Sequence, residues 1–580
     1  MLKNLLMNPK NTYLFLSILF SIIYSILALQ QGFNTEYIVQ DDARQHVFWM
    51  RRFIDAELFP NDIIANYFQS VAPPGYTALY QMMAQLGIDP IVASKFLPLF
   101  LGIVTTFYGF HLALELLPIP LTGLISSLLL NQNLWMQDGL ISGTPKAFIY
   151  PIFLAFLYYF VKSAPWGMGI AIAILALCYP TLVFVCVIMS ILSLWLRVGA
   201  KENDMRFGLS QERRDYLVCF SNLGVSFLGL LPYILSTSEF GPVLTAGVGK
   251  TLPELLPGGR SSFFIRDPWA FWLYGRSGIG LGTAFAPPLI YSGLLLPVLL
   301  KFSTAFPLTK EIRHLLILPQ LLLGSGIMFL AAHGVLFKLH LPSRYTQHSL
   351  RIAIALSAGI VLTLILDKLW HIGKKITKNP KIPPSPFPIP YSLILATTAI
   401  IGTTLILYPH LALKKFPKTY YINGNFPSLY QFFQQQPKDI LIASLTEEVN
   451  NLPTFSQRSI LVGEEYAIPY HWGYYSQFRQ RTIDLIQAQY SIDPKIVRDF
   501  IEKYGIDFWL VSPDTFKIES IANNRWIIQY QSVATPAINQ LKSGKKPILA
   551  LAMPSCSVFE SQGLIVLPAN CILNVIGLAN

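Results

Sequence analysis

The chain has 580 residues, of which 53% are hydrophobic and only 13% are charged, and its mean hydropathy is +0.47. Soluble domains carry about 25% charged residues, so this composition excludes a fully soluble enzyme, a disordered chain and a disulfide-dense scaffold. The formal net charge is +12. Because the basic residues cluster in short loops between apolar segments, they indicate membrane topology and not a nucleic-acid partner.

Apolar segments of about 20 residues, the length that a membrane-spanning helix needs, recur along the chain. The first, 12–30, follows Lys3 and Lys10 and precedes no A-x-A cleavage site. It is therefore predicted to be an uncleaved anchor with a cytoplasmic N-terminus. Further spans are predicted at roughly 91–117, 119–136, 146–162, 166–197, 215–235, 283–301, 312–331, 345–366 and 392–413.

The segment 166–197 is interrupted by Tyr179-Pro180, and proline kinks or ends a helix, so one kinked helix or a hairpin could form. Lys162 and the basic loop 197–214 are both expected in the cytoplasm, which favours the hairpin. About 11 crossings result, and the C-terminus is then outside. The predicted external segments are 31–90, 137–145, 236–282, 332–344 and 414–580, and the lysine- and proline-rich loop 367–391 is predicted to be cytoplasmic.

Residues 414–580 have an ordinary polar content and alternate between strand and helix patterns. Strands are predicted in 439–445, 459–465 and 507–513, and helices at about 474–490 and 494–504. This alternation is typical of a small α/β domain. The predicted fold is therefore a polytopic α-helical membrane domain, 1–413, followed by an extracytoplasmic α/β domain, 414–580. Outside the cytoplasm, Cys556 and Cys571 could form a disulfide or remain two unpaired thiols.

The sequence Asp41-Asp42-Ala43-Arg44-Gln45-His46 follows the first span closely. Adjacent carboxylates repel each other, and one common use of such a pair is a general base beside a metal ligand or a second acid. If 42–58 is helical, Asp42, His46 and Trp49 share one face. The alternative is that Asp41 and Asp42 only cap this helix, because aspartate stabilises helix N-termini.

An acidic pair early in a large first external loop, on a polytopic chain with an external C-terminal domain, resembles the GT-C superfamily of membrane glycosyltransferases. Its members include protein O-mannosyltransferases, aminoarabinose transferases and oligosaccharyltransferases, which use polyprenyl-phosphate or polyprenyl-diphosphate sugars on the external face. The resemblance covers about residues 10–413. It implies that Asp41 or Asp42 acts as catalytic base or metal ligand.

Such a transfer releases a lipid phosphate, whose charge arginine can hold with its planar fork. Arg344, in Leu341-Pro342-Ser343-Arg344-Tyr345, looks like the late arginine–tyrosine segment of some GT-C enzymes and is the leading candidate for the phosphate ligand. The other candidate contacts of substrate or lipid phosphate are Arg260, Arg276, Lys146 and His46. The alternative for these cations is that they extend toward lipid headgroups or stabilise their loops.

Asp138 lies in the second external segment, where several GT-C enzymes place a second acid. With Asp42 it could bind Mg²⁺ or Mn²⁺ if the reaction depends on a metal, although an aspartate before glycine is also an ordinary turn signal. Arg351 lies two turns beyond Arg344, at a depth where a charge is functional by default or pairs with an acid. His333, His340 and His348 show no metal-ligand spacing and are interpreted as ordinary loop histidines.

The predicted function is transfer of a sugar from a polyprenyl-phosphate donor to an acceptor glycan, lipid or protein. The expected location is a bacterial-type plasma membrane, with the C-terminal domain periplasmic or extracellular. Two alternatives remain: a non-catalytic component of surface-polysaccharide assembly or export, and a transporter or flippase. Neither the sugar nor the acceptor follows from the sequence.

Overall fold

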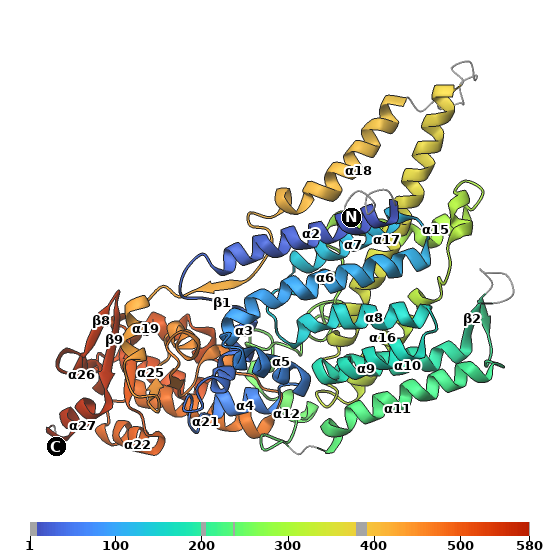
Figure 1. Ribbon diagram of the computed structural model, residues 1–580. Helices are drawn as coiled ribbons and strands as arrows, with labels where there is room; N and C mark the ends of the chain where they lie inside the picture. Colours follow the sequence, from blue (N-terminus) through green and yellow to red (C-terminus); the bar gives the residue numbers. More distant parts are fainter. Residues whose placement is uncertain (1–8, 138, 199–204, 236–237, 379–390, 579–580) are drawn as a thin grey trace.

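The apolar segments form a bundle of helices, and the C-terminal residues form a mixed α/β region at one end of it (Figure 1). The computed structural model describes residues 9–137, 139–198, 205–235, 238–378 and 391–578. The bundle consists of α2 (Pro9–Gly32), α6 (Pro90–Leu116), α7 (Pro120–Trp135), α8 (Ile149–Val161), α9 (Pro165–Cys178), α10 (Val183–Trp195), α11 (Arg213–Leu235), α15 (Leu296–Lys301), α16 (Ile317–Gly334), α17 (Ser343–Lys378) and α18 (Tyr391–Ala412).

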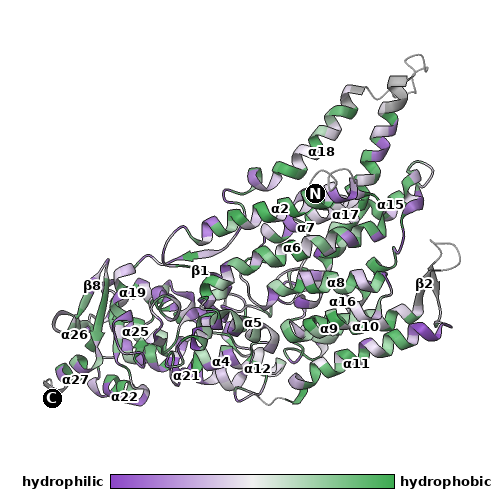
Figure 2. Cartoon of the chain, in the orientation of Figure 1, coloured by the Kyte–Doolittle hydropathy of each residue, from purple (hydrophilic) through white to green (hydrophobic). Residues whose placement is uncertain are grey.

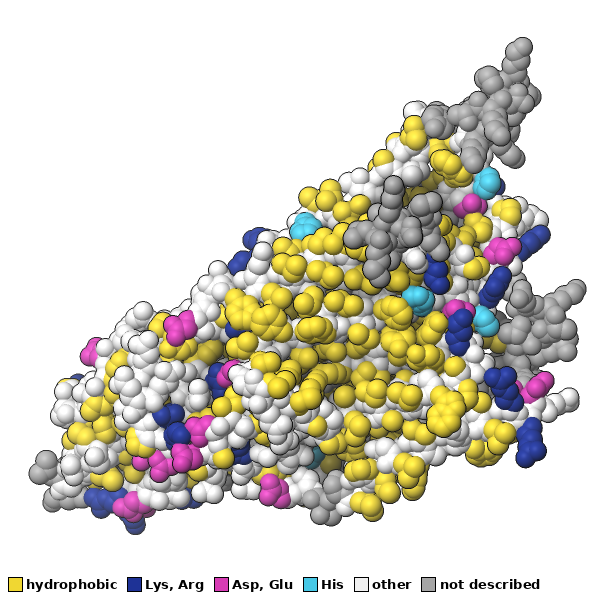
Figure 3. Space-filling model, viewed as in Figure 1, with side chains coloured by type: hydrophobic (Ala, Val, Ile, Leu, Met, Phe, Trp, Pro, Cys, Tyr) yellow, Lys and Arg dark blue, Asp and Glu magenta, His cyan; other side chains and the backbone are white. Residues whose placement is uncertain are grey.

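Six of these helices, α2, α6, α11, α16, α17 and α18, are long and apolar enough to cross a membrane. Figure 2 shows the bundle helices as mostly hydrophobic, and in Figure 3 hydrophobic side chains cover the middle of the molecule while charged groups gather at its two ends. An apolar belt between charged ends is the surface that a bilayer requires. The chain is therefore a helical membrane protein, and the count of about 11 crossings stays a prediction.

The segment 166–197 is a hairpin, which confirms the favoured alternative. Helices α9 and α10 meet at Pro180, whose ring allows no continuous helix through this point. Ser163, just before α9, accepts a hydrogen bond from Arg214 at 3.4 Å, and Leu194, at the end of α10, accepts one from Ser210 at 2.8 Å. Both ends of the hairpin thus lie beside the start of α11. Beyond α10, a two-stranded hairpin pairs β2 (Leu196–Val198) with β3 (Met205–Phe207).

Two predicted segments differ in the structure. The span expected at 283–301 consists of a 3₁₀ helix, Pro288–Leu295, followed by the six-residue α15. Pro287 and Pro288 lack the N–H groups that a helix crossing this segment would use, so its start is delayed. The loop expected at 367–391 is helical as far as Lys378, because α17 continues through its lysine-rich part.

The residues after α2 fold into short elements instead of an open loop. They are β1 (Ile38–Gln40), α3 (Asp41–His46), a 3₁₀ helix (Phe48–Phe53), α4 (Ile63–Ser70) and α5 (Pro74–Gln85). Strand β1 pairs antiparallel with β4 (Tyr421–Asn423), so that Val39 lies opposite Ile422. The segment after the first bundle helix therefore lies beside the segment after the last one.

The C-terminal region contains a five-stranded sheet in the order β6-β5-β7-β9-β8. Its strands are β5 (Leu441–Ala443), β6 (Ser459–Ile460), β7 (Phe508–Val511), β8 (Phe559–Ser561) and β9 (Leu564–Pro568). The β5–β6 and β5–β7 pairs are parallel, and the β7–β9 and β8–β9 pairs are antiparallel. The sheet is accompanied by α19 (Pro427–Gln434), α20 (Leu452–Phe455), α21 (Trp472–Gln489), α22 (Pro494–Tyr504), α23 (Ile518–Ala522), α24 (Arg525–Ile528), α25 (Gln531–Lys542), α26 (Ile548–Cys556) and α27 (Ala569–Leu578).

One hydrophobic core joins the segment after α2 to the C-terminal region. Val39, Phe48 and Trp49 belong to the same buried cluster as Tyr466 and Trp509, and all five side chains are fully buried. The ring centroids of Phe48 and Tyr466 are 5.6 Å apart in an edge-to-face arrangement, which is favourable for aromatic pairs. The division of the chain into two domains at residue 413 stays a prediction. Residues before and after this boundary pack together in the same hydrophobic core.

Cys556 and Cys571 form a disulfide, with their Cα atoms 5.6 Å apart. Cys178, Cys186 and Cys219 are buried free thiols. We expect the unfolded, unreduced protein to react with a thiol reagent at these three cysteines and not at Cys556 or Cys571, as measured by mass spectrometry. Labelling at all five positions would contradict the pairing.

Because the bridge closes a loop of 15 residues, replacing both bridged cysteines by serine should lower the free energy of unfolding by about 3 kcal/mol.

Candidate functional site

A polar cavity of about 370 Å³ lies where the bundle meets the C-terminal region. Its wall comes from the segment after α7, the 3₁₀ turn Pro145–Phe148 before α8, the first turns of α17 and the residues that precede β4. The lining residues are Met136, Gln137, Gly139, Lys146, Arg344, Gln347, His348, Arg351, Lys418 and Tyr420. Four of these side chains are lysine or arginine, and the described lining includes no carboxylate. The cavity therefore offers a concentrated positive charge, which favours an anion.

Helix α17 supplies one wall because Arg344, His348 and Arg351 have i, i+4 and i+7 spacing and so share a face. The Tyr150 hydroxyl lies between two of them. It is 2.8 Å from Nδ1 of His348 and accepts a hydrogen bond of 3.0 Å from Nη1 of Arg351. Arg351 is buried, and its described partner is this phenol instead of the acid expected as one alternative. Tyr150 thus fixes two cavity side chains from α8.

Asp42 reaches the edge of this cavity through an ion pair with Lys146. Neither acid is the N-cap of α3, which is Gln40, whose side-chain oxygen accepts a hydrogen bond from the Ala43 amide at 3.1 Å. Both acids lie in the first turn, where a negative charge still stabilises the helix N-terminus. Asp41 and Asp42 are the first two residues inside the helix. Both carboxylates are therefore free of the capping hydrogen bond and available to other groups.

The charges around Asp42 determine its protonation state. Burial alone would raise the pKa of this carboxyl, but Lys146 outweighs burial, with smaller contributions from His46 and Arg344, and the pKa is lowered. Burial, together with Lys146 and Arg344, lowers the pKa of His46 despite the nearby Asp42. At neutral pH the site therefore holds an aspartate anion beside an uncharged imidazole.

Asp41 points away from the cavity, toward the C-terminal region. Its carboxylate accepts a hydrogen bond of 2.7 Å from Nη2 of Arg44, and its amide donates to the carbonyl of Tyr420 at 3.1 Å. Arg44 in turn forms an ion pair of 3.0 Å with Glu465. The two adjacent acids therefore have different surroundings, and of the two carboxylates it is that of Asp42 that contacts a side chain lining the cavity.

The structure does not bring every predicted cation to the cavity. Arg344 and Lys146 line it, whereas Arg260 and Arg276 do not. Arg260 forms an ion pair of 3.2 Å with Glu465 and donates to the Glu465 carbonyl at 2.7 Å. Arg276 donates to the Tyr470 hydroxyl at 2.7 Å. Both arginines belong to the loop 238–282, which contains α12 (Ala246–Gly249) and α13 (Pro268–Leu273) and ends at the start of α14 (Leu281–Ala284).

The surroundings of Asp42 do not favour the predicted metal site. Asp138 lies outside the described residues. Among those that the structure describes, no three His, Cys, Asp or Glu side chains come together as a metal site, and Asp42 lies among Lys146, His46 and Arg344. Cations around a carboxylate disfavour a divalent metal there. The described donor set does not fit Mg²⁺ or Mn²⁺.

Several polar lining residues were missed by the sequence interpretation, namely Gln347, His348, Lys418 and Tyr420. His348 was interpreted as an ordinary loop histidine, but its position one turn after Arg344 places it on the same helix face. Lys418 and Tyr420 lie on the segment that links α18 to β4, and no motif marks them. Lys418 is held there by a hydrogen bond of 2.9 Å from its amide to the Trp135 carbonyl, a contact between residues far apart in the chain.

No family model matches the chain, and no curated protein matches it. Solved structures do. The oligosaccharyltransferase AglB from Archaeoglobus fulgidus, in complex with an inhibitory peptide and a dolichol-phosphate, has a TM-score of 0.56 at 11% identity, covering 90% of this chain and 72% of that chain. Mycobacterial arabinofuranosyltransferase AftD, in a mutant form, has a TM-score of 0.51 at 14% identity, covering 86% of this chain and 36% of that chain. At such identities the likeness shows the fold alone, which is the GT-C fold of membrane glycosyltransferases.

Proposed function

We propose that this protein is a membrane glycosyltransferase that moves a sugar from a polyprenyl-phosphate donor to an acceptor on the external face. The observation that carries the proposal is the ion pair between Asp42 and Lys146 at the edge of a cavity with four cationic side chains. A base next to a phosphate site is what such a transfer needs. The fold, shared with an oligosaccharyltransferase that was solved with a dolichol-phosphate and with an arabinofuranosyltransferase, supports the same function.

The donor phosphate binds in the cationic cavity. Arg344 and Arg351 can hold its oxygens with paired N–H donors, and Lys146 and Lys418 add point charges. His348, fixed by Tyr150, provides a further polar contact. Because the cavity is partly enclosed by protein, each of these charges acts more strongly on the phosphate than it would in open water.

The lipid tail has a site on the same helices. A second cavity, of about 860 Å³, runs along α2, α7, α17 and α18 and is mostly lined by apolar side chains, among them Leu124, Leu128, Leu366 and Ile401. Helix α17 and the segment that follows α7 also line the cationic cavity. A polyprenyl chain lying in the apolar cavity, with its phosphate toward Arg344, would bury hydrocarbon and pair charge in one ligand.

Asp42 acts as the general base. When the donor phosphate enters, Lys146 can pair with it, and this weakens the hold of Lys146 on the carboxylate. The acceptor oxygen or nitrogen then attacks the anomeric carbon and its proton passes to Asp42, while the bond from that carbon to the phosphate oxygen breaks. The electron pair leaves with the lipid phosphate, whose added negative charge Arg344 and Lys146 stabilise.

This scheme places the cavity on the external face and needs no metal. The Cys556–Cys571 disulfide favours an oxidising compartment for the C-terminal region, in agreement with the predicted cytoplasmic N-terminus. One solved oligosaccharyltransferase of this fold contains zinc and sulfate. A metal in the present chain would have to recruit Asp138 and displace Lys146 from Asp42.

The test uses a strain that lacks the protein and carries either the wild type or the Asp42→Asn variant. We expect the deletion strain to accumulate one lipid-linked sugar and to lose one surface glycan by mass spectrometry, and the wild type to restore both. The Asp42→Asn strain should resemble the deletion at equal membrane abundance. Unchanged lipid and glycan profiles in the deletion strain would instead favour a role in assembly, export or transport.

A further inference from the structure

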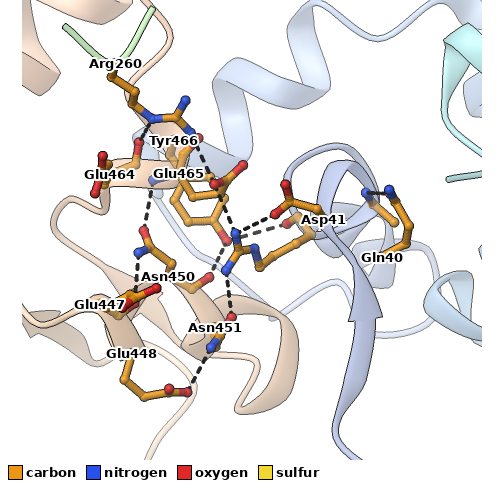
Figure 4. A network of polar contacts seen from close by, with 12 residues as sticks. Gln40, Asp41, Arg260, Glu447, Glu448, Asn450, Asn451, Glu464, Glu465 and Tyr466 are labelled. Carbon is orange, nitrogen blue, oxygen red and sulfur yellow. Dashed lines mark hydrogen bonds and ion pairs between the residues drawn. The ribbon is translucent and has the colours of Figure 1, made fainter. Parts of the chain in front are cut away.

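Arg44 belongs to a polar network that joins three parts of the chain. Figure 4 shows other members of this network, among them Asp41, Asn451, Glu465 and Arg260. The Arg44 guanidinium donates to Asp41 at 2.7 Å and to Asn451 at 2.8 Å, and it lies 3.0 Å from Oε2 of Glu465. The same Glu465 oxygen lies 3.2 Å from Nη2 of Arg260. The network thus connects helix α3, the loop 238–282 and the C-terminal region.

The C-terminal side of this network is rigidly held. The Glu465 amide donates to the side chain of Asn450 at 2.9 Å, and the buried Tyr466 hydroxyl donates to the Asn450 carbonyl at 3.0 Å. Asn451 is held in turn by a hydrogen bond of 3.0 Å to Glu448. Glu465 therefore presents its carboxylate to Arg44 from a fixed frame, and not from a mobile loop.

Only six residues form helix α3, and they include Asp41, Asp42 and Arg44. A helix this short has little stability of its own, so its orientation depends on the contacts of its side chains. Gln40 and the β1–β4 pairing hold its start. Arg44 holds its middle, one turn after Asp41. Any shift of Arg44 would rotate α3 and move Asp42 relative to Lys146 and the cavity.

We propose that Arg44 and Glu465 are positioning residues, and that the ionised Glu465 holds Arg44, and with it helix α3, in the orientation that aims Asp42 at the cationic cavity. This inference rests on the proposed function for its catalytic consequence. It also assigns a role to Asn451 and Glu465 of the C-terminal region, which help to complete the site without lining the cavity.

The charge balance around Glu465 makes the role testable. Burial raises the pKa of this carboxyl, Arg260 and Arg44 lower it, and Asp41 and Asp42 raise it, so that it lies at about 7. Ionisation across neutral pH therefore strengthens the attraction for Arg44. Since the ordinary glutamate pKa is near 4.5, the unfolded chain loses this proton first, and the folded protein loses stability as the pH rises from about 4.5 to 7.

Activity and stability should consequently change in opposite directions with pH. We expect the turnover rate of the purified wild type to fall about tenfold for each pH unit below 7. In Glu465→Gln this dependence should be absent, the turnover rate at pH 8 should be lower by about tenfold or more, and KM should change little. The melting temperature of Glu465→Gln should exceed that of the wild type at pH 8, and the difference should disappear below about pH 4.5. The matched control is Glu447→Gln, an exposed acid of the same region, which should keep the wild-type profiles.

The two readouts separate this inference from the proposed function. A variant that is more stable and less active at pH 8 supports a positioning role, because a simple structural defect would lower both. If Glu465→Gln keeps the wild-type pH dependence of the rate, or melts at a lower temperature at pH 8, the inference is overturned. If the wild type transfers no sugar, the proposed function fails. The melting temperatures still show whether ionisation of Glu465 lowers the stability of the folded protein.

Discussion

Replacing Asp42 by asparagine is expected to lower the rate of sugar transfer by about 10²- to 10⁴-fold, the usual contribution of a general base. The carboxamide keeps the shape of the side chain but cannot accept the acceptor's proton. It also loses the ion pair with Lys146, which adds to the net positive charge next to the cavity. The measurement is the turnover rate of purified protein with a lipid-linked donor, compared at equal amounts of folded protein.

Two aspartate variants serve as comparisons for this result. Asp499→Asn changes an exposed carboxylate on α22 and should leave the rate unchanged. Asp41→Asn should cost less than Asp42→Asn, because the Asp41 carboxylate contacts Arg44, whose side chain does not line the cavity. An inactive Asp41→Asn together with an active Asp42→Asn would reassign the base to Asp41, and normal activity of both variants would exclude a carboxylate base in this helix.

The second large effect is expected at Arg344. Its replacement by alanine should lower kcat/KM for the donor by about 10²- to 10³-fold, as the loss of one preorganised donor to a developing negative charge does in other enzymes. Arg344→Lys keeps the charge but loses the paired N–H donors, so it should recover only part of the rate. The kinetic constants are measured over a series of donor concentrations.

Arg266 provides the matched control for Arg344, because it is an exposed arginine of the loop 238–282. Its alanine variant should behave like the wild type. Equal losses in both variants would point to a general effect of surface charge on membrane binding. If Arg344→Ala retained full kcat/KM, the donor phosphate would have to bind elsewhere than in the cavity formed by α17.

Local patterns in the sequence predicted much of the fold. Uninterrupted apolar runs marked the helices of the bundle, because lipid forces backbone polar groups to pair within one segment. Pro180 and the basic residues on either side predicted the α9–α10 hairpin. The predicted strands that coincide with β5 and β7 follow from short runs of large apolar residues. Each of these features depends on neighbours in the sequence.

The candidate site was only partly accessible to the same approach. Asp42, Lys146 and Arg344 stood out because charges are rare and costly in an apolar chain. His348 was overlooked, although its spacing from Arg344 would have indicated it. Arg260 looked like a phosphate ligand, yet the structure pairs it with Glu465, since a loop arginine binds whichever carboxylate the fold brings to it.

The sequence by itself determined that this chain is a helical membrane protein with an acidic pair after its first span, because composition and hydrophobic runs are local properties. Only the tertiary structure decided that β1 pairs with β4, that Lys418 and Tyr420 close the cavity, and that Glu465 reaches Arg44. These contacts join residues at opposite ends of the chain. The sequence offers several alternative partners for each of these contacts. The shared core that packs Phe48 against Tyr466 brings together the partners that are observed.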